Sequence, residues 1–122
     1  MPEPVQPERL EEFCAMTADS PAGRVYGWFD RELQPRGFFA GLIVPDPYSA
    51  ALQGLEVFWW TAPKWRGRPS LALMKKFEED CKESGCKRVI FGFTRFVEPE
   101  KTRKLYRKLG YEFHSEFVSK EI

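Results

Sequence analysis

The chain has 122 residues, of which 43% are hydrophobic and 16% aromatic, and its formal net charge is +1 at pH 7. This length predicts one compact domain, residues 1–122, and is too short for two. The aromatic content excludes a disordered chain, and the balance of 19 basic and 18 acidic residues argues against a nucleic-acid partner.

Cysteine and histidine usage narrows the class of protein further. Three cysteines, Cys14, Cys81 and Cys86, form no Cys-x-x-Cys pair, which predicts reduced thiols and a cytoplasmic protein. His114 is the one histidine, so we expect no metal site built on several histidines, and no metal cofactor. No apolar run approaches the length of a membrane span, and we expect neither a membrane partner nor a secretory signal.

The N-terminal half is predicted to contain one helix and two strands. Apolar residues recur at helical spacing near the N-terminus, and short apolar runs bounded by proline and glycine follow. The expected elements are a helix over Pro7–Met16, a turn over Thr17–Gly23, a strand over Arg24–Leu33, a turn over Gln34–Gly37, a buried strand over Phe38–Val44 and a connection over Pro45–Gly54.

An aromatic strand is predicted next, over Leu55–Thr61. Strand side chains alternate between the two faces of a sheet. Leu55, Val57, Trp59 and Thr61 are therefore expected on one face, with Glu56, Phe58 and Trp60 on the other. At least one of the two tryptophans should then belong to the core.

A basic turn follows this strand. It carries Lys64, Arg66 and Arg68 with no acidic residue, and a helix is expected to begin at Pro69-Ser70 and to end at Gly85. Backbone N–H groups at a helix start have no partner within the helix, and the helix dipole favours negative charge there. Strand, cationic turn and helix start together predict a site for an anionic, phosphate-bearing ligand.

The C-terminal part is predicted to complete an α+β fold. We expect a strand over Cys86–Phe93, a helix from Glu98 to Leu109 that stops at Gly110, and a last strand over Tyr111–Lys120. A strand, helix and strand in succession favour a parallel unit. The predicted architecture is a mixed central β-sheet flanked by helices, one before the core strands and two after them.

Two segments resemble the GNAT superfamily of N-acetyltransferases. The strand ending at Pro63, with the Arg66-Gly67-Arg68 turn and the helix after it, is similar to the family's acetyl-CoA segment. Leu105 to Tyr111, read Leu-Tyr-Arg-Lys-Leu-Gly-Tyr, is similar to its Leu-Tyr-x-Lys-Leu-Gly-Phe element. The resemblance implies a GNAT-like acyl-CoA N-acyltransferase fold. The pairing of Phe58-Trp59-Trp60 with so short a chain is similar to small GNAT-like proteins of phage genomes.

The turn departs from the family pattern at two positions. Arg66 takes the family's Arg/Gln position, but Pro69 and Leu71 stand where two glycines are expected. Proline has no N–H to donate, so one backbone donor is lost. The resemblance implies that acetyl-CoA is held by the aromatic strand end and by the turn, namely by Trp59, Trp60, Thr61, Arg66, Gly67, Arg68, Ser70 and Leu71.

The reaction that the resemblance implies is direct attack of a primary amine on the acetyl thioester. A backbone N–H within Trp59–Thr61 is expected to stabilise the carbonyl oxygen, and Tyr106 is expected to protonate the departing thiolate. Glu56 is the candidate general base. The acceptor is an amine of a small molecule or of a protein lysine, and the oligomeric state stays open, a homodimer included.

Other interpretations of these residues stay open at this point. Tyr106 could be a tyrosine that only packs beside Leu105. Glu56 could be a solvated or ion-paired carboxylate. Arg66 and Arg68 could belong to a solvated surface turn. The alternative function is a degenerate GNAT fold that acts as a non-catalytic protein- or DNA-interacting module, and the two missing glycines favour it.

Overall fold

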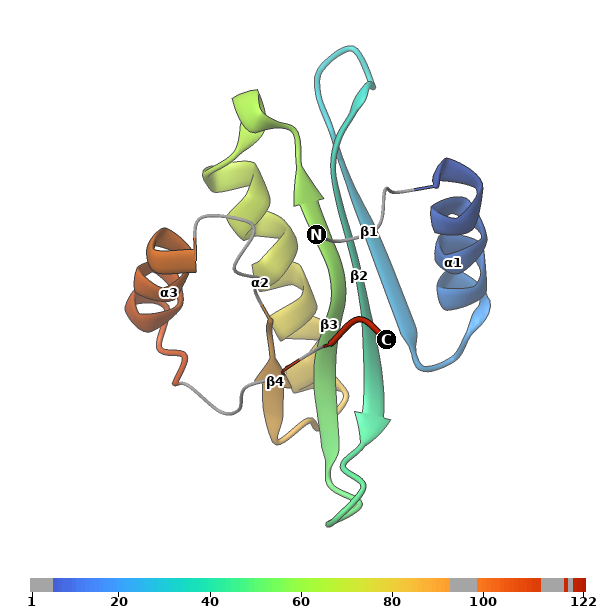
Figure 1. Ribbon diagram of the computed structural model, residues 1–122, viewed down its shortest axis with the longest axis vertical. Helices are drawn as coiled ribbons and strands as arrows, with labels where there is room; N and C mark the ends of the chain where they lie inside the picture. The colour runs from blue at the N-terminus through green and yellow to red at the C-terminus, as the bar shows by residue number, and fades with distance from the viewer. Residues whose placement is uncertain (1–5, 93–98, 113–117, 119) are drawn as a thin grey trace. The chain divides into compact units, whose positions relative to one another are not determined.

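The computed structural model of the chain describes residues 6–92, 99–112, 118 and 120–122 (Figure 1). The chain divides into two compact units, Met1–Phe91 and Gly92–Ile122. Its elements, in chain order, are α1 (Pro7–Asp19), β1 (Gly23–Phe29), β2 (Pro35–Pro45), β3 (Leu52–Thr61), the short 3-10 helix η1 (Pro63–Trp65), α2 (Arg68–Glu83), β4 (Arg88–Ile90) and α3 (Pro99–Lys108).

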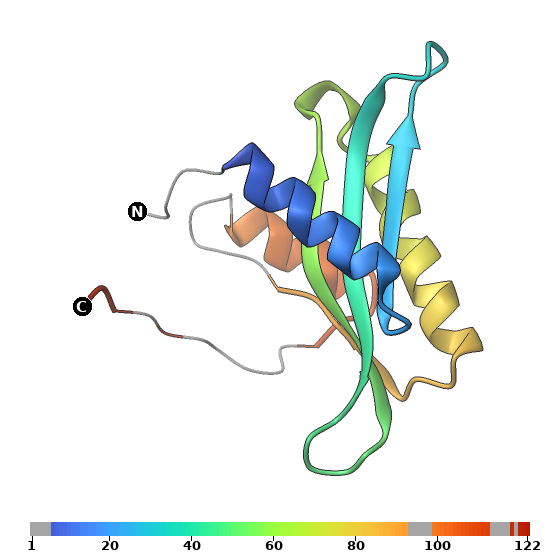
Figure 2. The same cartoon turned by 90° about the vertical axis from the view of Figure 1, so that its right-hand side faces the viewer.

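The first unit is built on a four-stranded sheet with the strand order β1-β2-β3-β4. β2 pairs antiparallel with β1 and with β3, whereas β3 pairs parallel with β4. Helix α1 lies on one face of this sheet and α2 on the other (Figures 1 and 2). The mixed sheet and the parallel β3-α2-β4 unit confirm the predicted α+β architecture, with one helix before the core strands.

Helix α1 runs to Asp19, so the prediction that it ends at Met16 is wrong. The Thr17 hydroxyl donates to the Phe13 carbonyl at 2.7 Å, inside the helix, and Thr17 is only 5% exposed. A Cβ on Gly23 would lie 1.7 Å from the Thr17 carbonyl oxygen, so only glycine allows β1 to begin this close to the helix. Tertiary packing therefore extends the helix into the segment predicted as a turn.

The turn between β1 and β2 lies earlier than predicted. β1 ends at Phe29 rather than Leu33, and β2 already begins at Pro35, inside the turn expected over Gln34–Gly37. Asp30 accounts for the shift, because its carboxylate accepts two backbone N–H groups of the turn at 2.9 and 3.0 Å. These bonds close the turn immediately after Phe29.

The core of this unit lies between the sheet and α2. Phe39 from the sheet and Phe77 and Cys81 from α2 are fully buried, and the rings of Phe39 and Phe77 lie 4.8 Å apart. Burial and, secondarily, the neighbouring Cys86 raise the pKa of the Cys81 thiol to about 12, as expected for a packing cysteine. A second link joins the helix to β1, because the Tyr26 phenol donates to the Asp80 carboxylate.

Helix α2 and strand β4 follow the prediction to different degrees. α2 spans Arg68–Glu83, and Gly85 ends it with a φ of +83°, so the predicted glycine stop is confirmed. β4 is shorter than the predicted Cys86–Phe93, because it pairs with β3 only along Arg88–Ile90. Beyond that point β3 continues without pairing to β4.

The second unit contains α3, which confirms the helix expected in this region. α3 spans Pro99–Lys108, and Gly110 follows it with a φ of +87°. Most of the strand predicted over Tyr111–Lys120, and His114 with it, lies outside the described residues. In the part of the chain that the structure describes, no helix has the length and apolar character needed to cross a membrane.

Candidate active site

The turn between β3 and α2 is held in shape by side chains at its two ends. The Thr61 hydroxyl, at the end of β3, donates to the Ser70 hydroxyl in the first turn of α2 at 3.1 Å. Arg66 Nε donates to the Thr61 carbonyl at 3.0 Å. Thr61 is only 4% exposed, so it is a buried joint between strand and helix. The position of the helix start relative to the strand end is therefore fixed.

Backbone donors at this helix start are fewer than the sequence suggests. Gly67 caps α2 with a φ of +117°, a conformation that side chains disfavour. Pro69 has no N–H, and the N–H of Leu71 donates to the Gly67 carbonyl at 2.9 Å. The backbone N–H of Leu71, a residue that the resemblance places in the cofactor site, is therefore used within the helix. Gly67, Arg68 and Ser70 keep N–H groups in the part of a helix that has no intrahelical acceptors.

The turn is cationic over its whole length. Lys64, Arg66 and Arg68 are exposed, and no acidic residue lies between Pro63 and Ser70. Because Arg66 uses Nε to bind the Thr61 carbonyl, its guanidinium is held in place rather than swinging freely. A diphosphate is a fitting ligand for such a set of fixed N–H donors and positive charges.

Among the residues that the structure describes, no strand pairs with the edge of β3 beside this turn. β3 pairs with β4 only along Gln53–Leu55, although β3 continues to Thr61. The N–H of Ala62 donates to the Arg36 carbonyl at 2.8 Å, and backbone groups alternate along a strand. Trp60 therefore directs its N–H toward β2, and Trp59 and Thr61 direct theirs toward the opposite edge. Of the donors predicted within Trp59–Thr61, these two face the side of β4.

Glu56 lies on a different face from the one predicted. The strand register pairs Gly41 with Glu56 but Ala40 with Phe58, so Val57 is the extra residue of a β-bulge. Opposed residues share a face, and Gly41 faces α2, because a Cβ there would lie 2.7 Å from the Phe77 ring. Glu56 is thus on the α2 face, directly after the last residue that pairs with β4. The expectation that it shares a face with Phe58 and Trp60 is wrong.

The two tryptophans lie on opposite faces, as predicted. Trp59 is opposite Phe39 in the register and packs against the core on the α2 face. Trp60 is opposite Phe38 on the other face and is 46% exposed. The prediction that at least one tryptophan belongs to the core is confirmed by Trp59.

Tyr106 belongs to the second unit and lies in α3. Its hydroxyl donates to the Gly92 carbonyl at 3.0 Å, and the residue is 8% exposed. The rings of Tyr106 and Tyr111 lie 5.7 Å apart. In this structure the single hydroxyl proton is engaged by the Gly92 carbonyl, so the hydroxyl must turn away from that acceptor before it can donate to another group.

The chain was compared with known proteins. The family described as "Acetyltransferase (GNAT) family" matches residues 1–111. The chain belongs to the GNAT acetyltransferase family. This membership confirms the predicted family, the fold class and an N-acetyltransferase. A comparison with curated proteins gives no significant match.

Solved structures share this GNAT fold. An acetyltransferase from Trypanosoma brucei is 19% identical with a TM-score of 0.75, covering 98% of this chain and 82% of its own. A putative acetyl transferase from Pyrococcus furiosus is 20% identical with a TM-score of 0.78, covering 100% and 83%. AAC(6')-Iy, solved with the bisubstrate analog CoA-S-monomethyl-acetylneamine, is 14% identical with a TM-score of 0.77, covering 99% and 82%.

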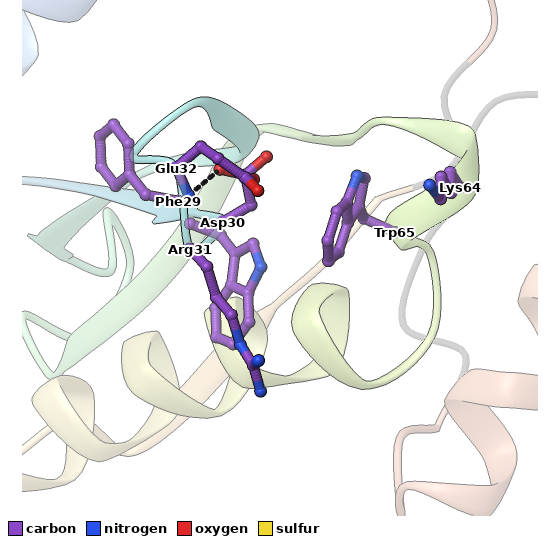
Figure 3. A pocket seen from close by; sticks show the side chains of 7 residues that line it. Phe29, Asp30, Arg31, Glu32, Lys64 and Trp65 are labelled. Carbon is purple, nitrogen blue, oxygen red and sulfur yellow. Dashed lines mark hydrogen bonds between the residues drawn. The ribbon is translucent and has the colours of Figure 1, made fainter.

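Sequence reasoning missed one feature of this GNAT protein, a pocket of about 430 Å³ next to the turn (Figure 3). The β1–β2 turn contributes Arg31 and Glu32 to its lining, and η1 contributes Lys64 and Trp65. The close-up shows the Trp65 ring facing the side chains of the β1–β2 turn. Lys64 and Trp65 lie inside the basic turn, whereas the hairpin brings the other lining residues there from far along the chain.

Proposed function

We propose that this protein transfers the acetyl group of acetyl-CoA to a primary amine by direct attack of the amine on the thioester. The observation that carries the proposal is the β3–α2 turn, where a buried joint fixes a cationic helix start beside a strand edge that β4 does not cover. Acetyl-CoA supplies the activated acyl group. A structural neighbour solved with a CoA-containing analog supports the choice of cofactor.

The residues of the turn fit the diphosphate of acetyl-CoA. Gly67, Arg68 and Ser70 offer backbone N–H groups, and the side chains of Arg66 and Arg68 offer charge-assisted bonds. These side chains compensate for the donors missing at Pro69 and Leu71. We therefore assign the diphosphate to this helix start, with electrostatics contributing more than in a glycine-rich turn.

The edge of β3 that extends beyond β4 fits the rest of the cofactor. The pantetheine arm contains amide groups, and such groups bind an exposed strand edge as an added strand does. The N–H groups of Trp59 and Thr61 lie on this edge. We assign one of them to the thioester carbonyl oxygen, which becomes more negative during attack and needs a fixed donor.

Glu56 is proposed as the base that keeps the attacking amine neutral. An alkyl ammonium has a pKa of about 10, so it is protonated at neutral pH and needs a proton acceptor. Glu56 directly follows Leu55, the last residue of β3 that pairs with β4. A carboxylate there accepts the proton directly or through a water.

Tyr106 is proposed as the acid that protonates the departing thiolate. For this step its hydroxyl proton leaves the Gly92 carbonyl, to which it is donated in this structure, and passes to the thiolate. Replacement by phenylalanine should lower kcat about 100-fold while the Kd for acetyl-CoA stays within about twofold. Release of the CoA thiol, followed with a thiol reagent, measures the first quantity, and calorimetry measures the second.

Tyr111→Phe is the matched control for this experiment, because Tyr111 is the neighbouring ring and has no proposed role. Its kcat should stay close to that of the unmodified protein. An unchanged kcat in Tyr106→Phe removes Tyr106 from the mechanism. Small alkyl and aromatic amines and lysine-containing peptides serve as acceptors. If none of them receives an acetyl group, the proposed reaction is contradicted.

The role of Glu56 is tested by pH. Glu56→Gln should lower kcat/KM at neutral pH, and the loss should shrink as pH rises toward about 10, where the amine loses its proton unaided. A loss of equal size at every pH contradicts a base role and indicates a structural one.

A further inference from the structure

Two cysteines meet at the C-terminal end of α2, the end opposite to the β3–α2 turn. Cys81 lies in the last turn of the helix, and Cys86 directly follows Gly85, in the segment that leads into β4. The Cys86 N–H donates to the Cys81 carbonyl at 2.9 Å. The Gly85 N–H donates to the Lys82 carbonyl at 3.1 Å, and Gly85 has a positive φ. These bonds form a Schellman motif, which brings the residue after the glycine back over the last turn of the helix.

The backbone bond limits how far apart the two cysteines can lie. The path between their Cα atoms runs through the Cys81 carbonyl and the Cys86 N–H, and contains one hydrogen bond of 2.9 Å. With standard backbone dimensions for the rest of this path, the Cα atoms are at most about 6.8 Å apart, which is the upper limit of the separations found in disulfides. The helix end therefore holds the pair at a distance that a disulfide can bridge.

The two thiols also lie against the same part of the core. Cys81 is fully buried, and Cys86 is partly buried and packs against the core cluster that contains Cys81. After burial, Cys86 is the largest cause of the raised pKa of the Cys81 thiol, as expected for neighbouring sulfur atoms. Cys14 lies in α1, on the other face of the sheet (Figure 2). Cys86 is thus the thiol partner within reach of Cys81.

Their different exposure gives the two thiols different roles in oxidation. Cys86 can meet a small oxidant from solution, whereas the buried Cys81 cannot. Hydrogen peroxide oxidises the Cys86 thiol to a sulfenic acid, as the O–O bond breaks and one water leaves. The Cys81 sulfur then attacks the Cys86 sulfur, so that the S–S bond forms, the S–O bond breaks and a second water leaves. The two thiols together lose two electrons and two protons, which the peroxide takes up.

We propose that Cys81 and Cys86 form a redox-sensitive pair, which a peroxide oxidises to a disulfide that clamps the end of α2 to the segment entering β4. This segment is also anchored to β3, because the Lys87 N–H donates to the Leu52 carbonyl at 2.8 Å. The disulfide would restrict the unfolded chain and so stabilise the folded protein. In a reducing compartment both cysteines stay thiols until an oxidant reaches Cys86.

The first test treats the reduced, unmodified protein with hydrogen peroxide and maps its cysteines by digestion and mass spectrometry. We expect a bond between Cys81 and Cys86 within one molecule, an unpaired Cys14, and recovery of both thiols with dithiothreitol. Three results overturn the inference. They are persistence of both free thiols, conversion of Cys86 to a sulfinic acid without a bond to Cys81, and pairing of either residue with Cys14 or with a second molecule.

Variants then assign the bond to the two residues. Cys86→Ser should form no disulfide and should keep Cys81 as an unreacted thiol, because Cys81 is buried. Cys14→Ser is the matched control and should form the bond as the unmodified protein does. Circular dichroism of each reduced variant checks that it is folded. A peroxide-treated Cys86→Ser that loses the Cys81 thiol contradicts the order of the two steps, and a Cys14→Ser that forms no bond contradicts the pairing.

The melting temperature tests the clamp itself. The oxidised form of the unmodified protein, and of Cys14→Ser, should melt about 5 °C above its reduced form, because the disulfide closes only a short loop. Cys86→Ser should melt at the same temperature before and after treatment with peroxide. If the mapped disulfide leaves the melting temperature unchanged or lowers it, the bond does not act as a clamp and the inference is overturned.

Discussion

Asp30 organises the turn that borders the pocket. Its side chain is only 2% exposed and accepts hydrogen bonds from Arg36 Nε and from the backbone N–H groups of Glu32 and Gln34. These donors hold the pKa of the Asp30 carboxyl below its ordinary value of 3.8, with the Arg36 bond as the largest cause. The charged form is therefore favoured more in the folded protein than in the unfolded chain.

This shift predicts how stability depends on pH. A lowered pKa in the folded state stabilises the protein above the ordinary value of 3.8, and the benefit disappears as pH falls through the lower folded pKa. Asp30→Asn should therefore reduce the free energy of unfolding in urea at pH 7. The difference from the unmodified protein should shrink at pH values below about 4.

Asp19→Asn, at the exposed end of α1, is the control for loss of a surface carboxylate. It should change the free energy of unfolding little at either pH. A difference between Asp30→Asn and the unmodified protein that stays constant from pH 7 to pH 3 contradicts the assignment of the effect to the Asp30 charge.

At the scale of elements, the contact between α2 and β3 depends on glycine. A Cβ on Gly54 would lie 2.3 Å from Cys81 Sγ and 3.2 Å from the Phe77 ring. Both neighbours are fully buried, so neither has room to withdraw. β3 and α2 carry the two ends of the proposed cofactor turn. Their close approach therefore sets where the helix start lies.

Gly54→Ala should lower the free energy of unfolding by about 1–3 kcal/mol, because it overpacks this contact. Removing the sulfur with Cys81→Ala should relieve part of the clash. The double variant, Gly54→Ala with Cys81→Ala, should therefore lose less free energy of unfolding than the sum of the two single losses. Urea unfolding of the unmodified protein, the two single variants and the double variant completes this double-mutant cycle. Additive losses contradict a direct Gly54–Cys81 contact.

Gly92→Ala is the matched control for the Gly54 substitution, because a Cβ at Gly92 would meet nothing within 4 Å. Its free energy of unfolding should stay within about 0.5 kcal/mol of the unmodified protein. A loss as large as that of Gly54→Ala contradicts the overpacking argument.

Elements with local signals could be predicted from the sequence, and those set by distant partners could not. The ends of α2 follow from Pro69 and Gly85, which act within one turn of the helix. The face of Glu56 depends on the bulge at Val57, which exists only because β2 pairs on both sides of it. Alternation read along a single strand carries no information about such a bulge.

The same distinction applies to the candidate site. The basic turn and its helix start are contiguous in the sequence, so their character could be read directly. The N–H of Leu71 could not be assigned from the sequence, because it donates to the Gly67 carbonyl, a bond that depends on where the helix begins. The pocket joins Trp65 to Arg31 across a hairpin, and no local pattern links residues so far apart.

The whole molecule combines an acetyltransferase fold with a proposed cofactor turn that departs from the family pattern. The GNAT family match covers residues 1–111, yet Pro69 and Leu71 replace the two glycines that the family pattern expects. Arg66, Arg68 and the remaining N–H donors are proposed to replace the contribution of those glycines. Charge then matters more for cofactor affinity, and salt should weaken that affinity by screening the exposed cations.

The side chains of the turn can be separated from its backbone. Arg66→Ala combined with Arg68→Ala should weaken acetyl-CoA binding and flatten its dependence on salt, because fewer charges are left to screen. Lys75→Ala combined with Lys87→Ala removes two exposed cations outside the turn and serves as the charge control. Equal affinity in the arginine variant and the unmodified protein means that these arginines do not touch the diphosphate.

The most direct test of the central claim is a calorimetric titration of the unmodified protein with acetyl-CoA at low and at high salt. We expect saturable one-to-one binding with a Kd below about 1 mM, and weaker binding at high salt. No saturable binding at millimolar acetyl-CoA under either condition would contradict it, and the turn would then be a helix start that binds no cofactor.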